Sequence, residues 1–388
     1  MKSEVPKISV VIPARNSKET IGKCFESLAA MDRYDFEVII VDDGSTDGTA
    51  EICESFSGKS GEDLFVKRSS PDPSPKTSTS CPLGSLRCER KLPNGQDMEF
   101  FEGNPGGTFL HKKVPPGFPV KIIRVGQGGP SRARNRGIAA AAGEFVAFTD
   151  ADCIVDTTWL TELEKGFTGP DIAGVGGDQK SPDDETETGR LIQEFLKTVG
   201  FMTGYIKTGA KMKETEHNPT CNSMYRKKVL EEVGGFDEAL WPSEDVELDL
   251  KITRRGYKLV FNPEAVVAHY RPKTYRDFAR MMRRYGASQW YLVKKYGFFR
   301  KLHFVPVALI IGLAVFVSLL SRDVRFWPII FVPWPLMFLW FYLKTRDVGK
   351  SLRFFHLFIV TIVNWNWGFL QADSNLQKRS ARDLRRKV

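Results

Sequence analysis

Apolar positions in the N-terminal part of the chain follow two alternating patterns. Residues 8–12 and 36–41 are short, β-branched apolar runs, and residues 20–31 between them place apolar side chains at helical spacing. The alternation continues with a helix over 46–56, a strand over 120–125, a helix over 131–142 and a strand over 145–149. Strands that alternate with helices predict an α/β fold with a mostly parallel, Rossmann-like sheet. Because ligands of such sheets sit outside the carboxyl ends of the strands, the segments after Val41 and Thr149 are the first places to look for chemistry.

The alternation is interrupted over residues 57–119, which contain nine of the 22 prolines of the chain. Such a composition predicts an inserted, exposed and partly disordered loop. A structureless stretch of that length is unusual inside a compact domain. We therefore expect a small hairpin formed by Phe100-Phe101 and residues 109–114.

Three charge-free apolar runs follow near the C-terminus, at residues 302–321, 326–343 and 354–372. Each approaches the roughly 20 residues that a bilayer-spanning helix needs. The first two predict a transmembrane hairpin. The third is more polar, and it is expected to span, to lie in the interface or to pack beside the hairpin. The sequence thus predicts attachment to a membrane by two to three helices.

Charge is distributed unevenly over the 388 residues, whose net charge is +9. Residues 275–388 hold 20 Lys and Arg against five acidic residues. Short basic segments mark the cytoplasmic side, so we expect a multi-pass protein of the cell membrane with its N-terminal domain in the cytoplasm. Basic residues that flank apolar runs are typical of membrane anchors, and we expect no nucleic-acid partner. Six cysteines without a CxxC pair favour a reducing compartment, and the short apolar run Ile8–Ile12 argues against a secretory leader.

A basic and apolar segment precedes the first apolar run. Residues 274–295 mix apolar side chains such as Phe278 and Met282 with Arg283, Arg284 and other basic residues. This pattern favours a helix that lies in an anionic membrane interface. The alternative is a basic helix that packs on its own domain.

Carboxylates follow two of the predicted strands. Asp42 and Asp43 begin an acidic, glycine-containing turn, and they can accept hydrogen bonds from a nucleoside. Alternatively the turn only caps the next helix through Thr46 or Asp47. Asp150-Ala151-Asp152 follows the later strand and places two carboxylates where one hard divalent ion, Mg²⁺ or Mn²⁺, can bind. Such an ion neutralises charge on a departing nucleotide.

A glycine-rich turn over residues 126–129 leads into a helix that begins with Arg132 and Arg134. Phosphate can bind at such a helix start, and either arginine can pair with a diphosphate unless both are plain surface charges. Pro130 and Ser131 depart from the dinucleotide fingerprint, which disfavours a dehydrogenase.

Taken in order, these motifs resemble those of the family 2 glycosyltransferases, which are inverting enzymes of the GT-A fold that use nucleotide-sugar donors such as UDP- or GDP-sugars. The resemblance covers roughly residues 8–57 and 120–272, and its motifs are the opening strand 10–16, the turn 42–49, the donor helix 133–137, the metal motif 150–152 and the acidic segment 234–245. It implies that the nucleotide sugar is bound by Pro13, Arg15, Asp42, Asp43, Arg132, Arg134, Asn135, Asp150 and Asp152.

The same resemblance implies roles on the acceptor side. Asp245 becomes the general base that takes a proton from a sugar hydroxyl, with Glu244 beside it to position the acceptor. Taken without the family, both are first-turn acids that favour a helix dipole. His269 is a candidate third metal ligand beside Asp150 and Asp152, although lone histidines are usually structural. Trp241 either stacks on an acceptor sugar or packs in the core.

Processive members of the family carry a Gln-x-x-Arg-Trp motif after the acidic pair, and the nearest string here is Met282-Arg283-Arg284-Tyr285-Gly286. We therefore expect transfer of a single sugar to a hydroxyl of a lipid-linked or membrane-proximal glycan. The alternatives are a polyprenyl-phosphate sugar synthase and a non-catalytic membrane-tethered scaffold. The expected organisation is a GT-A domain over 1–273 with the insertion at 57–119, interface helices over 274–303, membrane helices over 304–372 and a basic tail over 373–388.

Overall fold

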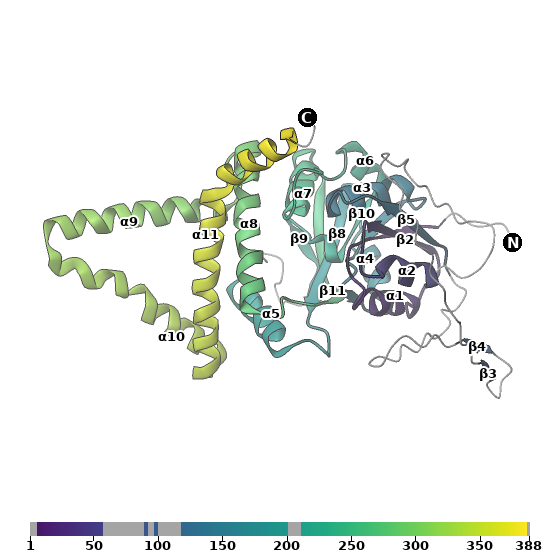
Figure 1. Cartoon of the computed structure of the whole chain (residues 1–388), viewed down its shortest axis with the longest axis horizontal. Helices are drawn as coiled ribbons and strands as arrows, with labels where there is room; N and C mark the ends of the chain where they lie inside the picture. The colour runs from purple at the N-terminus through teal and green to yellow at the C-terminus, as the bar shows by residue number, and fades with distance from the viewer. Residues whose placement is uncertain (1–5, 57–88, 92–96, 100–117, 201–210, 386–388) are drawn as a thin grey trace.

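The computed structural model describes residues 6–56, 89–91, 97–99, 118–200 and 211–385. A sheet flanked by helices forms the main body, and two helices project from it as a hairpin (Figure 1). Between the main body and this hairpin, the long helices α8 (Tyr275–Tyr296) and α11 (Val348–Arg385) run side by side. The chain therefore has three structural parts, and the sheet fixes the positions of most of the chemistry.

Nine of the described strands form one mixed sheet in the order β5-β2-β1-β6-β10-β8-β11-β7, with β9 paired to β11. Their bounds are β1 (Ile8–Ala14), β2 (Phe36–Asp43), β5 (Val120–Val125), β6 (Phe145–Phe148), β7 (Cys153–Val155), β8 (Ile172–Lys180), β9 (Lys213–Thr215), β10 (Ser223–Arg226) and β11 (Lys258–His269). The first four strands of that order are parallel, as the alternation predicts. β10 then runs antiparallel between β6 and β8, so the fully parallel part ends at β6.

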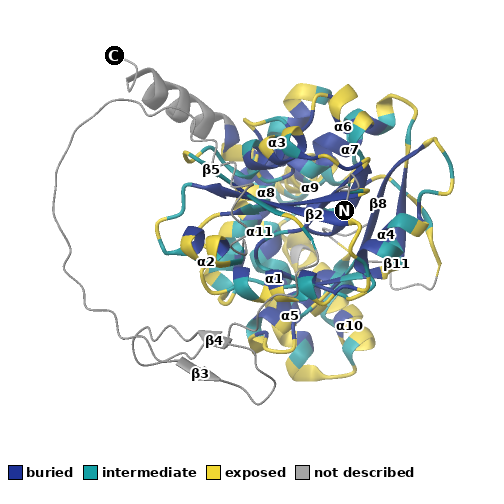
Figure 2. Ribbon diagram, turned by 90° about the vertical axis from the view of Figure 1, so that its right-hand side faces the viewer, coloured by how far each residue is buried: buried dark blue, intermediate teal, exposed yellow. Residues whose placement is uncertain are grey.

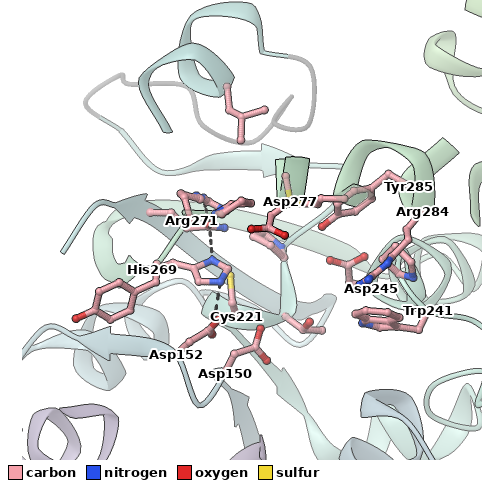
Figure 3. A pocket seen from close by; sticks show the side chains of 18 of the residues that line it. Asp150, Asp152, Cys221, Trp241, Asp245, His269, Arg271, Asp277, Arg284 and Tyr285 are labelled. Atoms are coloured by element: carbon pink, nitrogen blue, oxygen red, sulfur yellow. Dashed lines mark hydrogen bonds and ion pairs between the residues drawn. The ribbon is translucent and has the colours of Figure 1, made fainter. Parts of the chain in front are cut away.

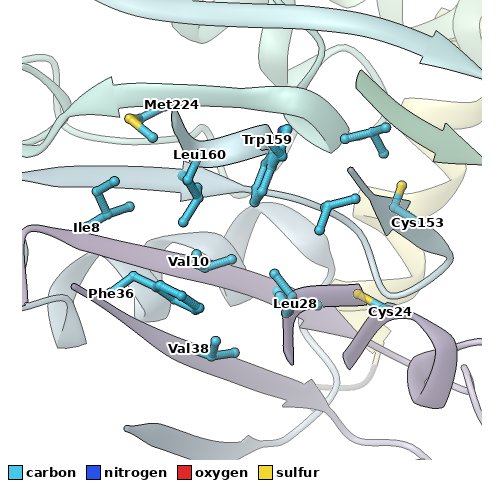
Figure 4. Close-up of a cluster of buried hydrophobic side chains, with 14 of the residues drawn as sticks. Ile8, Val10, Cys24, Leu28, Phe36, Val38, Cys153, Trp159, Leu160 and Met224 are labelled. Atoms are coloured by element: carbon cyan, nitrogen blue, oxygen red, sulfur yellow. The ribbon is translucent and has the colours of Figure 1, made fainter. Parts of the chain in front are cut away.

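Helices cover both faces of this sheet because its strands are apolar on both sides. Along β1, Val10 and Ile12 point into one core and Val11 into the other, which is the two-residue period of a strand. Figure 4 shows the first core, where Trp159 and Leu160 pack among strand side chains, and Figure 2 shows the buried strands between partly exposed helices. The covering helices are α1 (Ile21–Ala29), α2 (Thr49–Phe56) and α4 (Trp159–Lys165) on the first core, and α3 (Pro130–Ala140), α6 (Lys227–Glu232) and α7 (Glu244–Arg254) on the second.

The apolar face of the basic helix α8 (Tyr275–Tyr296) packs on the protein, and its position at a membrane interface stays a prediction. Phe278 and Met282 are fully buried in a cluster with α5 (Glu187–Val199) and α11 (Val348–Arg385). A Cβ added at Gly286 would lie 1.9 Å from the carbonyl oxygen of Trp365, so α8 and α11 approach at glycine contact distance. The apolar face of α8 therefore has a protein partner, and its pattern resembled a membrane helix because a helix that packs on another helix is amphipathic in the same way.

The hairpin differs from the rest of the molecule in exposing its apolar side chains. It contains η2 (Lys301–Phe304), α9 (Val305–Arg322), η3 (Val324–Phe331) and α10 (Pro333–Thr345). Within the described part of the chain, Lys301–Arg322 and Val324–Thr345 are long and apolar enough to cross a membrane. Only 6% of each candidate span is buried. The third apolar run lies in α11, which packs against α8 and, through Phe354 against Phe341, against α10 of the hairpin.

The insertion contributes a two-stranded antiparallel pair, β3 (Glu89–Lys91) with β4 (Asp97–Glu99). The hairpin predicted from Phe100-Phe101 and residues 109–114 lies outside the described residues. The described pair of strands lies before those positions, and the predicted hairpin stays a prediction.

Candidate active site

A cavity of about 1180 Å³ opens at the carboxyl ends of β1 and β6, where the alternation places the chemistry. Figure 3 shows Asp150, Asp152 and His269 on one side of it and Asp245, Trp241 and Arg284 on the other. The predicted site residues that line the cavity are Arg15, Arg134, Asp150, Asp152, Trp241, Glu244, Asp245 and His269. One concave surface thus gathers both acidic motifs, although about 90 residues separate them in the sequence.

Asp150, Asp152 and His269 form the metal-ligating candidate of the cavity. One ligand atom from each lies within 4.8 Å of the others. Asp152 follows β6, whereas His269 ends β11 and places its Nε2 3.5 Å from Asp152 Oδ1. Burial alone lowers the pKa of His269, but the charges of Asp152 and Cys221 and the ion pair with Asp152 together outweigh it, and the pKa rises to about 10. Two carboxylates and one imidazole fit a divalent ion such as Mn²⁺.

Arg134 joins the metal side of the cavity to the acidic pair. Its side chain is only 4% exposed, with Nη2 2.7 Å from Asp150 Oδ1 and Nη1 2.6 Å from Glu244 Oε1. Burial alone lowers the pKa of Arg134, but the two carboxylates more than offset this and raise it. Both terminal nitrogens therefore bind protein carboxylates, so the described contacts of Arg134 are structural ones across the cavity wall.

Glu244 and Asp245 open α7 and face the cavity from its first turn. Burial, reinforced by the charge of Asp245, raises the pKa of Glu244 to about 7 against the opposing effect of Arg134. Asp245 Oδ1 accepts a 2.8 Å hydrogen bond from the Val246 amide, and its side chain is 20% exposed. Asp245 is thus the more accessible of the two carboxylates.

The turn before this acidic pair is fixed by two helices. Ser243 has a positive φ of 77°, a conformation that needs support in a residue other than glycine. Its Oγ lies 2.7 Å from Ser288 Oγ and accepts a 2.9 Å hydrogen bond from Gln289 Nε2, both on α8. From the other side, Asn135 on α3 both donates to and accepts from the backbone of Phe236, each at 2.9 Å. These contacts hold the acceptor-side loop between α3 and α8.

Five of the residues predicted to bind the nucleotide sugar lie outside the cavity lining, and these are Pro13, Asp42, Asp43, Arg132 and Asn135. Asp43 accepts hydrogen bonds from the amides of Gly128 and Gly129 at 2.6 and 2.8 Å, so both of its oxygens hold the glycine-rich turn. Within the acidic turn it is Asp47 that lines the cavity. Asp47 also accepts from the Thr49 amide at 3.0 Å, which is the capping contact considered as the alternative.

Trp241 lies on the same side of the cavity as Asp245 (Figure 3) and is not a core residue. It is 51% exposed, and the guanidinium carbon of Arg284 lies 5.3 Å from its ring centroid. This excludes core packing, the alternative that the sequence left open. Arg284 also lines the cavity and comes from α8, so this helix contributes directly to the wall.

Sequence reasoning missed two residues of this wall. Arg271 lines the cavity and donates to Gln179 Oε1 at 2.6 Å, and it stands two residues after His269, on the continuation of β11. The alternation of side chains along that strand could have indicated it. His217 also lines the cavity, and the sequence does not indicate it, because a single histidine between short elements carries no pattern.

Comparisons with known proteins agree with this geometry. The model of the family described as "Glycosyl transferase family 2" matches residues 9–70 and 110–234, leaving a gap inside the insertion. The chain is 26% identical to the glycosyltransferase AglE of Haloferax volcanii over 69% of its own length and 68% of that protein. It is 22% identical, over 81% of its length and 84% of the relative, to a Methanococcus voltae enzyme that acts on dolichyl N-acetyl-α-D-glucosaminyl phosphate. Several other curated glycosyltransferases match over only about a third to just over half of their own length.

Among solved structures, the fold is similar to that of the mannosyltransferase PcManGT from Pyrobaculum calidifontis in complex with GDP-Man and Mn²⁺. The TM-score is 0.59 and the identity 16%, over 95% of this chain and 88% of that one. This likeness supports the GT-A fold. The family match and the named relatives support an enzyme rather than a non-catalytic scaffold. The parallel strands, the cavity at their carboxyl ends and the ordered motifs around it therefore have one explanation, which is that the chain belongs to glycosyltransferase family 2.

Proposed function

We propose that this glycosyltransferase moves one sugar from a UDP- or GDP-sugar to a hydroxyl group of a lipid-linked or membrane-proximal glycan, with inversion at the anomeric carbon. The observation that carries the proposal is the shared cavity. Its metal-ligating cluster, Asp150, Asp152 and His269, and its exposed carboxylate, Asp245, face the same space from different elements. A donor diphosphate and an acceptor hydroxyl can therefore meet there.

On the donor side, Asp150, Asp152 and His269 would hold a divalent ion, Mg²⁺ or Mn²⁺. When bound, such an ion supplies Lewis-acid stabilisation of the charge on the leaving nucleoside diphosphate. Arg134 keeps Asp150 in place through its 2.7 Å ion pair. Arg15, which is exposed at the cavity rim, is free to reach a phosphate.

On the acceptor side, Asp245 takes the proton of the attacking hydroxyl. A sugar hydroxyl is a weak nucleophile, and a carboxylate within hydrogen-bond reach accelerates its attack. The acceptor oxygen forms a bond to the anomeric carbon, the bond from that carbon to the diphosphate oxygen breaks, and the electron pair leaves with the diphosphate. One such displacement inverts the configuration. Trp241 offers its exposed ring to the acceptor sugar.

Two features support an acceptor held at a membrane. Arg280 and Arg284 line the cavity and come from α8, the helix that leads into the exposed apolar hairpin. The Methanococcus voltae relative carries a dolichyl-phosphate-linked acceptor in its name. We further propose that the hairpin crosses the cell membrane and that the cavity faces the cytoplasm, because basic residues precede the first candidate span.

Transfer of radiolabelled sugar tests the proposal directly. Membranes that contain the full chain are incubated with a panel of UDP- and GDP-sugars, with and without a chelator, and label in lipid-linked glycan is measured. We expect one donor to support transfer, and we expect the chelator, Asp152→Ala and Asp245→Asn each to lower it at least about a hundredfold. Asp171→Asn, a surface carboxylate paired with Lys258, serves as the control.

The outcomes separate the alternatives. Absence of transfer from every donor, in membranes shown to contain lipid-linked glycan, contradicts the proposal. Transfer that survives Asp245→Asn but not Asp152→Ala indicates an anionic phosphate acceptor, which needs no base, and hence a polyprenyl-phosphate sugar synthase.

A further inference from the structure

His217 is the histidine nearest to Asp245 among the described contacts of the cavity. Its Nε2 lies 3.7 Å from Asp245 Oδ2, and its Nδ1 lies 2.6 Å from Asp249 Oδ2. Asp245 and Asp249 stand four residues apart on α7 and therefore on one helix face. The imidazole thus lies between two carboxylates of the same helix.

Asp249 is built to hold this ring in one orientation. Its side chain is fully buried and accepts three hydrogen bonds, from His217 Nδ1 at 2.6 Å, from the Asn218 amide at 2.7 Å and from the Tyr225 hydroxyl at 2.8 Å. Burial raises the pKa of Asp249 above its ordinary value, and the three hydrogen bonds oppose this by favouring the charged form. The ring cannot turn without leaving Asp249 with one donor fewer.

The chemistry of the ring follows from what faces it. Only the protonated imidazole carries a hydrogen on both nitrogens, and here each nitrogen faces a carboxylate oxygen. Among the residues that the structure describes, the titratable groups that face the ring include Asp245 and Asp249 on α7, Tyr225 on β10, which reaches Asp249, and Cys221 on η1 (Thr220–Asn222). The two carboxylates dominate this set, and they favour the imidazolium form.

We propose that His217, clamped by Asp249, is a positioning residue for transfer, and that its imidazolium fixes the Asp245 carboxylate in the orientation in which it accepts the acceptor proton. This inference rests on the proposed role of Asp245 as the base. Oδ1 of Asp245 is already held by the Val246 amide, and His217 constrains Oδ2 from the other side. The acceptor proton goes to Asp245 and later to solvent, while His217 keeps its own proton throughout.

A pH dependence follows from this arrangement. Burial lowers the pKa of His217, but the charges of Asp245 and Asp249 outweigh it, so the pKa lies above its ordinary value. The imidazolium is therefore present at neutral pH and is lost as the pH rises through the folded-state pKa. Transfer should fall along an alkaline limb that reports this deprotonation.

The test compares pH–rate profiles of the full chain in membranes with the donor identified as above. In His217→Gln we expect kcat to fall roughly 10- to 100-fold, the KM of the donor to stay within about twofold, and the alkaline limb to disappear. His217→Asn keeps an amide near Asp249 but removes the group facing Asp245, and it should lose kcat to the same extent. His356→Gln, an exposed histidine on α11, is the matched control and should keep the wild-type profile.

Asp249→Asn tests the same inference without removing the histidine. Loss of one flanking carboxylate lowers the pKa of His217, so the alkaline limb of the pH–rate profile should move about one pH unit or more toward lower pH. An unmoved limb in this variant, a wild-type profile in His217→Gln, or a loss of rate that is equal at every pH each overturns the inference. Undiminished transfer by Asp245→Asn would instead overturn the proposed base, so failure of the inference and failure of the function give different results.

Discussion

Two carboxylate centres face one cavity, and they are partnered in opposite ways. On the metal side, the side chain of Asp152 is 46% exposed, and its charged neighbour is His269 at 3.5 Å. On the proposed acceptor side, Asp245 faces the cavity, and Asp249 behind it is fully buried and accepts three hydrogen bonds at 2.6 to 2.8 Å. Carboxylates with lone pairs to spare suit a metal ion, whereas fully partnered carboxylates suit the rigid support of a proton acceptor. The same residue type is thus suited to two different purposes, according to how many donors the fold gives it.

Arg134 connects the two centres, and its substitution is expected to have the largest effect on stability and transfer. Arg134→Gln leaves Asp150 and Glu244 without their buried cation, and removal of one partner of a buried ion pair costs about 3–5 kcal/mol. We expect a corresponding loss in the free energy of unfolding, together with loss of transfer. Denaturant unfolding of the purified protein in detergent measures the first.

The matched control is Arg132→Gln, two residues earlier on the same helix and outside the cavity lining. It should change the free energy of unfolding by less than about 0.5 kcal/mol. Equal changes in the free energy of unfolding for the two substitutions would mean that the ion pairs of Arg134 add no stability beyond that of a surface arginine.

Glu244 gives a prediction about pH. Its pKa is about 7 in the folded protein against an ordinary value of 4.5, so between these pH values the folded state binds more protons than the unfolded state. Stability should therefore fall as the pH rises through this window, by up to about 3 kcal/mol. In Glu244→Gln this contribution should vanish, and the difference between the two unfolding curves from pH 4.5 to 8 measures it. A difference that does not vary with pH would contradict the burial of an ionisable Glu244.

Stabilisation of the folded protein by bound Mn²⁺ tests the proposed metal side of the cavity. At 100 times the dissociation constant, Mn²⁺ should stabilise the wild-type protein by about 2.7 kcal/mol, seen as a rise in Tm. Asp152→Asn should abolish this rise, whereas Asp249→Asn should keep it because its carboxylate lies in the other centre. A metal-dependent rise that persists in Asp152→Asn would place the ion elsewhere.

Much of this arrangement is predictable from periodicity and chain order. The parallel strands β1, β2, β5 and β6 follow from the alternation, and the position of Asp150 and Asp152 follows from the rule that chemistry lies at carboxyl strand ends. These strands, and the residues that directly follow them, are determined by patterns of residues that are neighbours in the sequence.

Contacts between distant segments were not predictable in this way. Asp43 stands at the end of β2, as predicted, but its two oxygens accept hydrogen bonds from amides 85 and 86 residues further along the chain. Asn135 likewise holds a loop that lies 101 residues away in the sequence. His217 gains its place only because α7 brings Asp245 and Asp249 to it. The face of α8 could not be assigned from the sequence either, since a membrane surface and the neighbouring helix α11 demand the same apolar stripe.

The smallest expected effect concerns the acceptor. Trp241 is half exposed beside Arg284, and an aromatic ring that stacks on a sugar contributes about 1 kcal/mol. Trp241→Ala should therefore raise the KM of the acceptor about fivefold and leave the KM of the donor unchanged, because the donor centre lies across Arg134. Trp241→Phe keeps a ring and should recover most of the affinity. Equal rises in both KM values would indicate that the substitution disturbs the loop held by Asn135 and Gln289 rather than an acceptor contact. Steady-state kinetics with each substrate varied in turn separates these outcomes, and with them the acceptor side of the cavity from the donor side.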